Sequence, residues 1–366
     1  MKIILILANN DVGLYRFRKE LIEVLIKKYN YKVFISLPFG EFVPELIKLG
    51  CEFIDTKINR RSTNPINDFK LILSYMRIIS KVKPDIVLTY TIKPNIYGGL
   101  LCRLMNIPYL VNITGLGTAL ENNGILQKII LALYKVSLKK ASCIFFQNTE
   151  NADFFKRKGI IKGKHKLIPG SGVNLDDYKV MEYPDDSVVN FLFVSRIMKE
   201  KGIDYYLEAA EYIRRKYKNV RFHIVGFCEE AYEEKLKIYE DKDIICYHGM
   251  QKDVREFYKI SHCIIHPTYY PEGMSNVLLE SAACARPIIT TDKSGCREVV
   301  DDGINGFLVK EKDSQDLIEK IEKFLKLDFE NKRQMGLAGR MKVEKEFDRR
   351  IVVEHYISEI SNVLEW

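Results

Sequence analysis

The 366-residue chain lacks the closely spaced cysteine pairs that mark zinc sites and redox centres. Its eight cysteines are scattered along the sequence, most of them inside apolar runs, and no Cys-x-x-Cys pair occurs. This pattern gives no support for a cysteine-based metal centre and favours a reducing compartment. We therefore expect the protein to be cytoplasmic.

The sequence also has no apolar stretch of the roughly 18 to 20 residues that a membrane-spanning helix needs. The N-terminal apolar run from Ile3 to Ala8 is too short for a signal peptide, and polar residues follow it without a cleavage pattern. We expect this run to form a buried strand instead. The protein is predicted not to be integral to a membrane.

Histidines and metal-binding aspartate pairs are scarce as well. Five of the six histidines follow residue 184 and the sixth is His165, which argues against a histidine general base in the first half of the chain. The loops that could form a site contain no Asp-x-Asp metal-binding motif. The aspartate pairs at 176–177, 185–186 and 301–302 are adjacent residues in predicted turns. We expect no bound metal and no cofactor.

The sequence does contain a repeated alternation of short apolar runs and helical patterns, which is typical of parallel sheets with crossover helices. With 47% hydrophobic residues, it can fill the cores of two domains of about 150 to 200 residues each. Pro169–Asn174 and the polar residues 175–187 are the best candidate linker between two α/β halves. The predicted strands are Ile3–Leu7, Lys32–Ser36, Ile86–Tyr90, Tyr109–Ile113 and Ile144–Gln147, then a second set that begins at Phe191 and continues with Phe222–Val225, Ile244–Tyr247, Cys263–His266, Pro287–Thr290 and Gly306–Val309.

The net charge of +8 is unevenly distributed. Residues 1–183 contain 28 Lys and Arg against 15 Asp and Glu, a balance of +13, whereas residues 184–366 contain 29 against 34, a balance of −5. A basic first half indicates an anionic, extended partner such as a phospholipid surface or a lipid diphosphate. A solubility bias without a partner is the alternative. Because no nucleic-acid-binding motif accompanies the charge, we expect no nucleic acid partner.

Residues 124–140 combine a wide apolar face with four lysines. A helix of this kind can lie on an anionic membrane, although a core helix with its basic face in water explains the same pattern. Arg60 and Arg61 are a second candidate lipid-surface patch. We predict that the protein is peripheral on the inner face of the cytoplasmic membrane. The four lysines are Lys128, Lys135, Lys139 and Lys140.

Two carboxylates, Glu272 and Glu280, follow the predicted strand Cys263–His266 at a spacing of eight residues. Glu272 belongs to a Tyr-Tyr-Pro-Glu-Gly loop, and Glu280 belongs to the helical segment that continues from Met274. The carboxyl edge of a parallel sheet is where ligands bind, and a helix that begins there attracts an anion. Carboxylates about 10 Å apart suit a nucleotide sugar: one binds hexose hydroxyls, the other a ribose diol, with the diphosphate between them. Two unrelated solvated glutamates are the alternative.

Two cations follow another predicted strand, which ends at Ser195. Arg196 and Lys201 lie five residues apart in one strand-to-helix loop, from which both side chains can converge on one diphosphate. Glycosyl transfer needs the charge of this leaving group neutralised as the sugar–oxygen bond breaks. Ordinary solvated basic residues explain either cation alone, but the two clusters together favour the nucleotide-sugar interpretation.

With these motifs, the sequence resembles the large retaining glycosyltransferase family 4, of GT-B architecture, over essentially its whole length. The resemblance implies an α/β fold of two Rossmann-like domains that face a central cleft. Residues 1–172 would bind the acceptor and residues 185–349 the nucleotide sugar, with the final helix, residues 350–366, packing back onto the first domain. The matching motifs are Ser195-Arg196-x4-Lys201-Gly202, Glu272-x7-Glu280 and Asp302-Gly-Ile-Asn-Gly-Phe-Leu-Val309.

The resemblance also implies residue roles in a metal-independent transfer with retention at the anomeric carbon. Glu272 binds the donor sugar, Glu280 binds the ribose, and Arg196 with Lys201 binds the diphosphate, which makes Arg196, Lys201 and Glu272 the candidate catalytic residues. Gly13 follows the first strand and opens a helix, so its backbone can approach the donor phosphate, although many relatives carry paired glycines there. The further donor contacts in the glutamate loop are Gly273, Met274 and Ser275.

On the acceptor side, the segments Leu14–Arg18 and Thr114–Gly117 resemble those of enzymes that extend lipid-linked oligosaccharides. Arg16 and Arg18 begin a helix from which they can reach an acceptor diphosphate, and a basic amphipathic face explains them equally well. Loop solvation and a tight turn are the alternative for the remaining candidates. These are Lys93, Thr114 and Gly115.

We therefore predict an enzyme that moves a hexose or an N-acetylhexosamine from a UDP-sugar to a polyprenyl-diphosphate-linked saccharide. The product would be a surface polysaccharide such as capsule or lipopolysaccharide, or a glycan precursor. Two alternatives stay open: a UDP-sugar epimerase on the same fold, and a non-catalytic scaffold subunit of a polysaccharide assembly complex. The scaffold is favoured only by two departures from the family pattern, the single glycine at Gly13 and Ala285 in place of a glycine.

Overall fold

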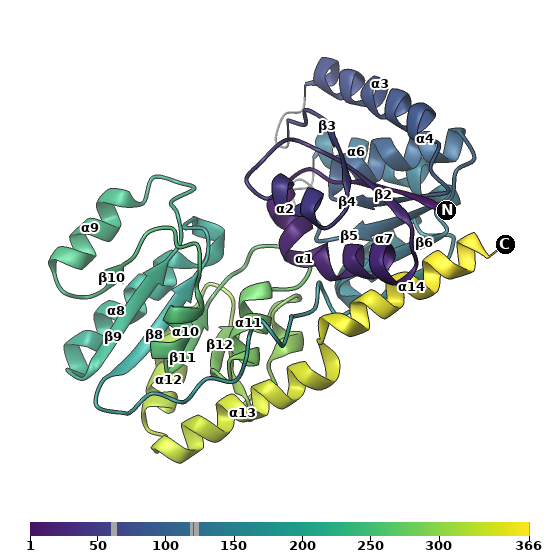
Figure 1. Ribbon diagram of the computed structural model, residues 1–366. Coiled ribbons are helices and arrows are strands. Elements are labelled where there is room, and N and C mark those ends of the chain that lie inside the picture. The colour runs from purple at the N-terminus through teal and green to yellow at the C-terminus, as the bar shows by residue number, and fades with distance from the viewer. Residues whose placement is uncertain (60–63, 118–119, 121–123, 366) are drawn as a thin grey trace. The chain divides into compact units, whose positions relative to one another are not determined.

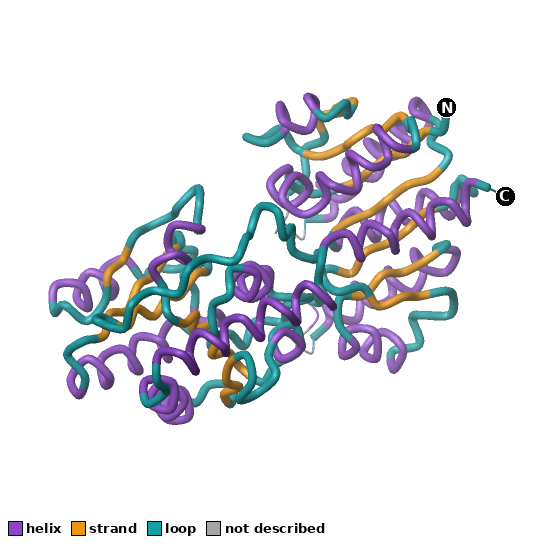
Figure 2. Tube along the Cα trace, turned by 60° about the horizontal axis from the view of Figure 1, so that its bottom comes forward, coloured by secondary structure: helices purple, strands orange, loops and turns teal. Residues whose placement is uncertain are grey.

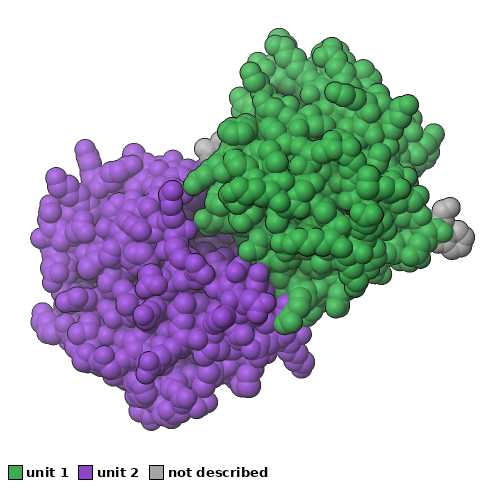
Figure 3. All heavy atoms as spheres, viewed as in Figure 1, with its two compact units in different colours: residues 1–172, 349–366 green, residues 173–348 purple. Residues whose placement is uncertain are grey.

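The computed structural model describes residues 1–59, 64–117, 120 and 124–365. The chain forms two compact units: unit 1 comprises Met1–Gly172 and Arg349–Trp366, and unit 2 comprises Val173–Asp348 (Figure 3). In each unit a sheet lies between layers of helices (Figure 2). The candidate patch of Arg60 and Arg61 lies outside the described residues.

Unit 1 is built on a sheet of seven parallel strands in the order β3-β2-β1-β4-β5-β6-β7 (Figure 1). The strands are β1 Ile3–Leu7, β2 Lys32–Leu37, β3 Glu52–Asp55, β4 Ile86–Tyr90, β5 Tyr109–Ile113, β6 Cys143–Phe146 and β7 His165–Leu167. The helices are α1 Asp11–Glu23, η1 Val24–Lys28, α2 Val43–Lys48, α3 Pro65–Val82, η2 Pro94–Gly98, α4 Gly99–Leu104, α6 Ile125–Ser137, η3 Leu138–Lys140, α7 Thr149–Arg157 and α14 Arg349–Leu364.

Both faces of the unit 1 sheet are covered by helices, which is why its central strands are mostly apolar. Successive side chains of a strand point to opposite faces. In β1, Ile4 and Ile6 therefore pack with α1, α2 and α14, whereas Leu5 and Leu7 pack with α3, α4, α6 and α7 on the other face. The result is two apolar cores, one on each side of the same sheet.

Unit 2 repeats this plan with six parallel strands in the order β10-β9-β8-β11-β12-β13. The strands are β8 Val189–Val194, β9 Val220–Val225, β10 Cys246–Tyr247, β11 Cys263–His266, β12 Ile288–Thr291 and β13 Gly306–Val309. The helices are η4 Lys199–Lys201, α8 Ile203–Lys216, α9 Glu233–Asp241, α10 Arg255–Ile260, α11 Asn276–Ala283, η5 Arg297–Val299, α12 Ser314–Leu325 and α13 Phe329–Glu346.

The core of unit 2 is again divided by the sheet. In β8, Phe191 and Phe193 pack with α8, α9 and α12 on one face, whereas Leu192 and Val194 pack with Tyr258 of α10 on the other. Strands β8 and β11 are parallel neighbours in this sheet, so their carboxyl ends lie at the same edge of unit 2. The confirmed α/β character of both units thus places the loops after these strands side by side.

Residues 173–187, which the sequence suggests as a linker, belong to unit 2. Tyr183 is buried and donates its hydroxyl hydrogen to the backbone oxygen of His262 at 2.9 Å. The fully buried guanidinium of Arg286 donates to the backbone oxygens of Met181 and Glu182, at 3.2 and 2.6 Å. The segment is therefore fastened to the domain by long-range hydrogen bonds that its polar composition does not indicate.

The final helix, α14, is part of unit 1. At its start, Arg349 forms an ion pair of 3.0 Å with Glu20 of α1, and near its end the buried Glu359 is paired with Lys164 and Lys166, each at 2.6 Å. Between them, Tyr356 lies in the core with its hydroxyl against Asn112 of β5. In the described part of the chain, no helix combines the length and the apolar character needed to cross a membrane.

Candidate active site

The loop after β8 is brought against the loop after β11 by a glycine. Gly202 has a left-handed φ of 79°, and a Cβ at this position would lie 2.0 Å from the backbone oxygen of Pro267. Only glycine permits both the conformation and the approach. The backbone oxygen of Glu200 completes the junction, because it accepts the N–H of Tyr269 at 2.9 Å and the hydroxyl of Thr268 at 3.2 Å.

This junction unites Lys201 with Glu272. The lysine Nζ forms an ion pair with Glu272 Oε1, and the two side chains are only 8% and 19% exposed. The ammonium group also lies 4.7 Å from the centre of the Tyr270 ring, which favours a cation over its face. Breaking a buried ion pair leaves an uncompensated charge, so each partner fixes the position of the other.

Arg196 lies on the same ring. Its guanidinium carbon is 5.4 Å from the centre of Tyr270, and its Nη1 is 2.5 Å from Oε2 of Glu229, a residue in the loop after β9. Tyr270 thus contacts both cations of the predicted diphosphate loop. The arrangement holds two positive charges around one aromatic side chain and places a carboxylate next to each.

Glu280 lies on α11, and its Oε2 accepts a hydrogen bond of 3.2 Å from the hydroxyl of Tyr258. Burial, followed by the negative charge of Glu280, raises the pKa of Tyr258 well above its usual value, so the phenol keeps its proton as a donor. Tyr258 is fully buried on α10. A rigid donor therefore orients the second carboxylate of the Glu-x7-Glu motif.

The segment between the two glutamates depends on Gly295 and Ser275. Gly295 has a left-handed φ of 90°, and a Cβ there would lie 2.8 Å from the Cβ of Glu272. Its backbone oxygen accepts the N–H of Ser275 at 2.7 Å. The Ser275 hydroxyl is 3.3 Å from Nε2 of His266 and does not cap α11. Gly273 and Met274 are buried within this loop.

His266, the last residue of β11, lies beneath the glutamate loop and is uncharged. It is 1% exposed, and burial, with a smaller effect of Lys201, lowers the pKa of His266 to about 3. Its Nδ1 has no hydrogen-bond partner among the described residues. The imidazole is therefore neutral near pH 7. In the same described ranges, no group of three or more His, Cys, Asp and Glu side chains could hold a metal ion.

Ala285, where the resemblance predicts a glycine, adopts a left-handed φ of 57° just after α11. For a residue with a Cβ this conformation costs about 1 to 2 kcal/mol. The position lies beyond the end of α11, whereas Glu272 and Gly273 precede its start. The departure therefore strains the exit of the helix and leaves the glutamate loop intact.

In unit 1, Gly13 uses its N–H within the helix. The N–H donates to the side-chain oxygen of Asn10 at 2.6 Å, which caps the start of α1. A Cβ at Gly13 would lie 3.0 Å from this oxygen, so the glycine gives room to the cap. In this structure the N–H of Gly13 is thus engaged by Asn10, and the phosphate contact stays a prediction.

Arg18 is enclosed in the core of unit 1. It is 4% exposed, and its guanidinium lies 5.1 Å from the Tyr90 ring and 5.6 Å from the Tyr356 ring. Its Nη1 donates to the backbone oxygen of Phe17 at 2.7 Å. We therefore assign Arg18 to the packing of α1 against β4 and α14 rather than to acceptor binding. Arg16 is exposed, with its guanidinium 5.8 Å from the Phe42 ring.

The remaining acceptor-side candidates follow adjacent strands. Lys93 lies after β4, where its Nζ is 2.6 Å from Oδ1 of Asp68 on α3. Thr114 and Gly115 follow β5, which pairs with β4, and Gly115 has a positive φ of 143°. The structure thus places the three candidates at the carboxyl edge of the unit 1 sheet, with Lys93 already held by a carboxylate.

Two residues of the site are not identified by its motifs. Glu229 lies in a run of acidic residues that reads as the solvated start of a helix, and nothing nearby in the sequence connects it to Arg196. Tyr270 has a weak signal, since it is one of two aromatic residues immediately before Pro271 and Glu272. Both become evident only when the loops after β8, β9 and β11 are brought together.

Two family models match the chain in succession. The model described as Glycosyl transferase 4-like matches residues 3–148, and the one described as Glycosyl transferases group 1 matches residues 183–342. Over 377 residues, the chain is 25% identical to the N,N'-diacetylbacillosaminyl-diphospho-undecaprenol alpha-1,3-N-acetylgalactosaminyltransferase of Campylobacter jejuni, with 98% of each chain covered. It is 27% identical over 279 residues to the UDP-Gal:alpha-D-GlcNAc-diphosphoundecaprenol alpha-1,3-galactosyltransferase of Escherichia coli, with 70% of each covered.

Solved structures share the fold over the whole chain. The sucrose-phosphate synthase of Thermosynechococcus elongatus matches with a TM-score of 0.82 at 19% identity, covering 100% of both chains. A glycosyltransferase of Rickettsia africae matches with a TM-score of 0.80 at 21% identity, covering 100% of this chain and 99% of the other. The likeness confirms the expected GT-B architecture. Residues 3–148 thus form a Glycosyl transferase 4-like domain and residues 183–342 a Glycosyl transferases group 1 domain, and the protein is a glycosyltransferase.

Proposed function

We propose that the enzyme transfers a hexose or an N-acetylhexosamine from a UDP-sugar to a polyprenyl-diphosphate-linked saccharide, with retention at the anomeric carbon and without a metal. One observation carries this proposal: Arg196 and Lys201 share the Tyr270 ring at the carboxyl edge of the unit 2 sheet, next to Glu272. Two cations and nearby carboxylates complement the diphosphate and the hydroxyls of a nucleotide sugar.

The two cations would act on the leaving group. As the bond between the anomeric carbon and the diphosphate oxygen breaks, negative charge develops on this oxygen, and preorganised cations stabilise it. The acceptor hydroxyl oxygen forms the new bond to the anomeric carbon from the same face of the sugar. Its proton passes to the departing phosphate oxygen, so the step needs no histidine base, in keeping with the burial of His266 and with its lowered pKa, which makes it a weak base.

The carboxylates would then bind the rest of the donor. When the diphosphate takes the place of Glu272 beside Lys201, the Glu272 carboxylate becomes available to the sugar hydroxyls. Glu280, which is oriented by Tyr258, would accept the hydrogens of the ribose diol. Gly273, Met274 and Ser275 form the connecting backbone between these two positions.

The acceptor assignment is supported by the relatives whose names specify diphospho-undecaprenol substrates. The chain is also 25% identical, over 380 residues, to the capsular polysaccharide biosynthesis glycosyltransferase CapM of Staphylococcus aureus, with 99% of this chain and 97% of the relative covered. Arg16, Lys93, Thr114 and Gly115 in unit 1 are the proposed acceptor contacts. A lipid-linked acceptor would place the enzyme on the cytoplasmic face of the membrane as a peripheral protein.

The test is thermal unfolding of the wild type and Glu280→Ala with UDP, GDP, ADP and a panel of UDP-sugars. A ligand at about 100 times its dissociation constant adds roughly 2.7 kcal/mol to the free energy of unfolding. We expect a shift that is selective for one UDP-sugar, is lost in Glu280→Ala, and persists in the control Glu319→Ala on α12. No shift with any nucleotide, or an unchanged shift in Glu280→Ala, would contradict the proposed donor site.

Two further assays test metal independence and retention at the anomeric carbon separately. Transfer that continues in the presence of EDTA would support the metal-independent route, and loss of transfer that Mg²⁺ or Mn²⁺ restores would contradict it. The anomeric proton of the product, followed by NMR from the start of the reaction, reports whether the donor configuration is retained or inverted.

A further inference from the structure

Helix α6 is apolar on its outer side as well as on its inner side. Its inner residues, among them Ile130, Leu131 and Tyr134, pack in the core of unit 1. On the outer side, Ile125 is 79% exposed and Ile129 is 51% exposed, and Leu126 and Val136 are exposed as well. Packing in the core therefore explains the apolar residues on the inner side of α6 only. Within the described residues, no other segment covers the apolar side chains on its outer side.

The apolar surface continues from α6 to the end of α4. The two helices are in contact, and Arg103 of α4 donates to the backbone oxygen of Val136 at 2.8 Å. Next to Arg103, Leu104 is 67% exposed and Met105 is also exposed. We call this surface the α6 face. Its apolar members are Leu104, Met105, Ile125, Leu126, Ile129 and Val136, and its basic members are Arg103, Lys128, Lys135, Lys139 and Lys140.

The segment that contains most of the α6 face is predominantly basic. Between residues 86 and 149 the sequence contains six basic residues and a single acidic residue, Glu121. Within the described residues, neither Lys128 nor Lys135 forms an ion pair. A face that combines exposed aliphatic side chains with unneutralised lysines is complementary to a surface that is apolar inside and anionic outside.

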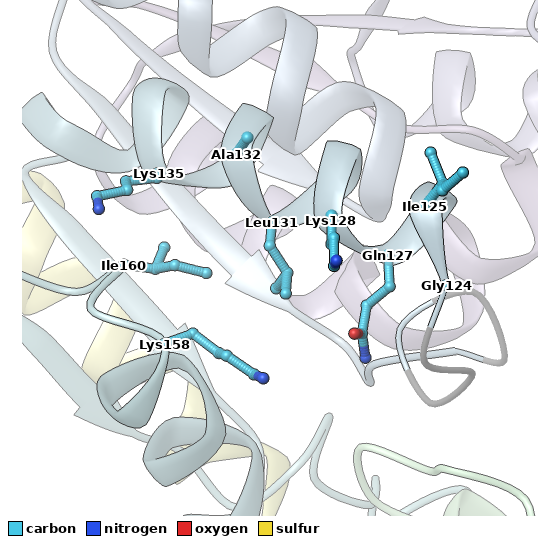
Figure 4. Close-up of a pocket in the computed structure, with 9 residues that line it drawn as sticks. All are labelled: Gly124, Ile125, Gln127, Lys128, Leu131, Ala132, Lys135, Lys158 and Ile160. Atoms are coloured by element: carbon cyan, nitrogen blue, oxygen red, sulfur yellow. The ribbon is translucent and has the colours of Figure 1, made fainter.

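Three lysines of this region surround an open groove of about 690 Å³ (Figure 4). Lys128 and Lys135 extend from α6, Lys158 lies just after α7, and Leu131 and Ile160 provide the apolar wall between them. Three ammonium groups around an apolar wall match a phosphate head group attached to hydrocarbon chains. The groove therefore adds a position for individual lipid head groups to the α6 face.

We propose that the α6 face docks unit 1 on an anionic phospholipid membrane, with lipid phosphates at Lys128, Lys135 and Lys158. A second copy of the chain is disfavoured because a two-fold contact would bring these lysines against one another. Nucleic acid is disfavoured because the exposed apolar residues are aliphatic and offer no ring on which a base can stack. The proposal deepens the proposed function, since it identifies the surface from which the enzyme would reach a lipid-linked acceptor.

The test is co-sedimentation with vesicles of phosphatidylcholine alone and of phosphatidylcholine and phosphatidylglycerol in equal parts. We expect binding to the anionic vesicles only, with release by salt. At about 1 kcal/mol for each lysine near the surface, Lys128→Gln/Lys135→Gln/Lys158→Gln should weaken this binding roughly a hundredfold. The control Lys27→Gln/Lys28→Gln/Lys48→Gln removes the same charge from the helices on the other side of the sheet and should weaken it far less.

A second variant tests the apolar contribution. Ile125→Ser/Ile129→Ser should lower binding to the anionic vesicles at least about tenfold, because burial of each isoleucine is favourable by roughly 1.5 to 3 kcal/mol. The control Ile47→Ser/Ile238→Ser replaces two isoleucines on α2 and α9 that are about as exposed as Ile129, and it should leave the binding unchanged. In a Trp366→Phe background, Ile129→Trp should shift its fluorescence to the blue on anionic vesicles.

Three outcomes would overturn the proposal: equal binding to neutral and anionic vesicles, equal effects of the α6-face and control variants, or a wild-type dimer that Ile125→Ser/Ile129→Ser converts to monomer. The last outcome would assign the face to a second copy. UDP binding, measured by calorimetry on the same variants, distinguishes this failure from failure of the proposed function. If a variant loses vesicle binding but keeps its affinity for UDP, the result bears on the α6 face alone. If the protein binds vesicles but does not bind UDP, the result contradicts the proposed donor site and leaves the α6 face untouched.

Discussion

Arg196 and Glu229 form an ion pair in which Nη1 and Oε2 are 2.5 Å apart. The backbone reinforces the pair, because the N–H of Glu229 donates to the oxygen of Ile197 at 3.0 Å and joins the loops after β8 and β9. Lys201 is neutralised by Glu272 in a similar way. Both cations proposed for the donor diphosphate thus carry a carboxylate in this structure, and the donor has to displace one or both.

Glu229→Gln should therefore bind UDP more tightly than the wild type. The variant removes a negative charge that competes with the diphosphate for Arg196. Because the arginine side chain is 36% exposed and screened by water, we expect a gain of about 1 kcal/mol, or roughly fivefold. Calorimetric titration with UDP measures it. The control is Glu230→Gln, whose carboxylate accepts the N–H of Lys199 instead. Unchanged or weaker binding by Glu229→Gln would show that the carboxylate does not compete.

The sequence predicts the strands that are buried on both faces and misses those at the edges of the unit 1 sheet. A central strand such as β4, Ile-Val-Leu-Thr-Tyr, is mostly apolar and rich in residues that favour strands, which distinguishes it from a loop. The edge strands β3, Glu-Phe-Ile-Asp, and β7, His-Lys-Leu, are short, partly exposed and partly charged. Because one side of an edge strand faces solvent, its sequence need not follow a periodic pattern, and neither strand was predictable from apolar character.

Local sequence also locates the site loops but not their partners. Arg196, Lys201 and Glu272 follow predicted strands, so the topology of a parallel sheet brings them to one edge. The burial of Arg18 depends on Tyr90 and Tyr356, which lie far away in the sequence and enclose it only after folding. The same reason explains residues 173–187: the polar segment is fixed by a buried arginine, Arg286, more than ninety residues later.

Lys201→Ala should lower turnover by roughly 10²- to 10³-fold, about 2.7 to 4 kcal/mol, if Lys201 stabilises the leaving diphosphate as oxyanion donors do. The rate is measured in single turnovers at saturating donor, with circular dichroism to confirm that the variant folds. Lys199→Ala, an exposed lysine in the same short helix, is the matched control and should retain the wild-type rate. Wild-type turnover by Lys201→Ala would remove this residue from the mechanism.

Tyr270 is predicted to position the two cations through its ring. Tyr270→Leu should reduce kcat/KM by at least about fivefold, because two cation–π contacts of about 0.5 to 2 kcal/mol each are lost. Tyr270→Phe keeps the ring and should retain most activity. The control Tyr269→Leu removes a neighbouring ring that contacts Lys312, at 4.6 Å, rather than the two site cations. Equal losses in Tyr270→Leu and Tyr270→Phe would assign the effect to the hydroxyl group instead.

His266 should make unit 2 sensitive to acid. Burial and Lys201 lower the pKa of His266 to about 3, whereas a histidine in the unfolded chain takes up its proton near pH 6.5. Between these values the unfolded state binds more protons than the folded state, so the free energy of unfolding falls as the pH falls. From about pH 7 to pH 5, this one group contributes a loss of roughly 2 kcal/mol.

The loss should be smaller by this amount in His266→Gln, as measured by urea unfolding at each pH. The control is His165→Gln on β7 of unit 1, where the side chain is partly exposed and the acid sensitivity of unit 2 should be unchanged. If the wild type and His266→Gln lose the same stability between the two pH values, His266 is protonated in the folded state. The site would then carry a third positive charge beside Lys201, which would strengthen its attraction for a diphosphate at acidic pH.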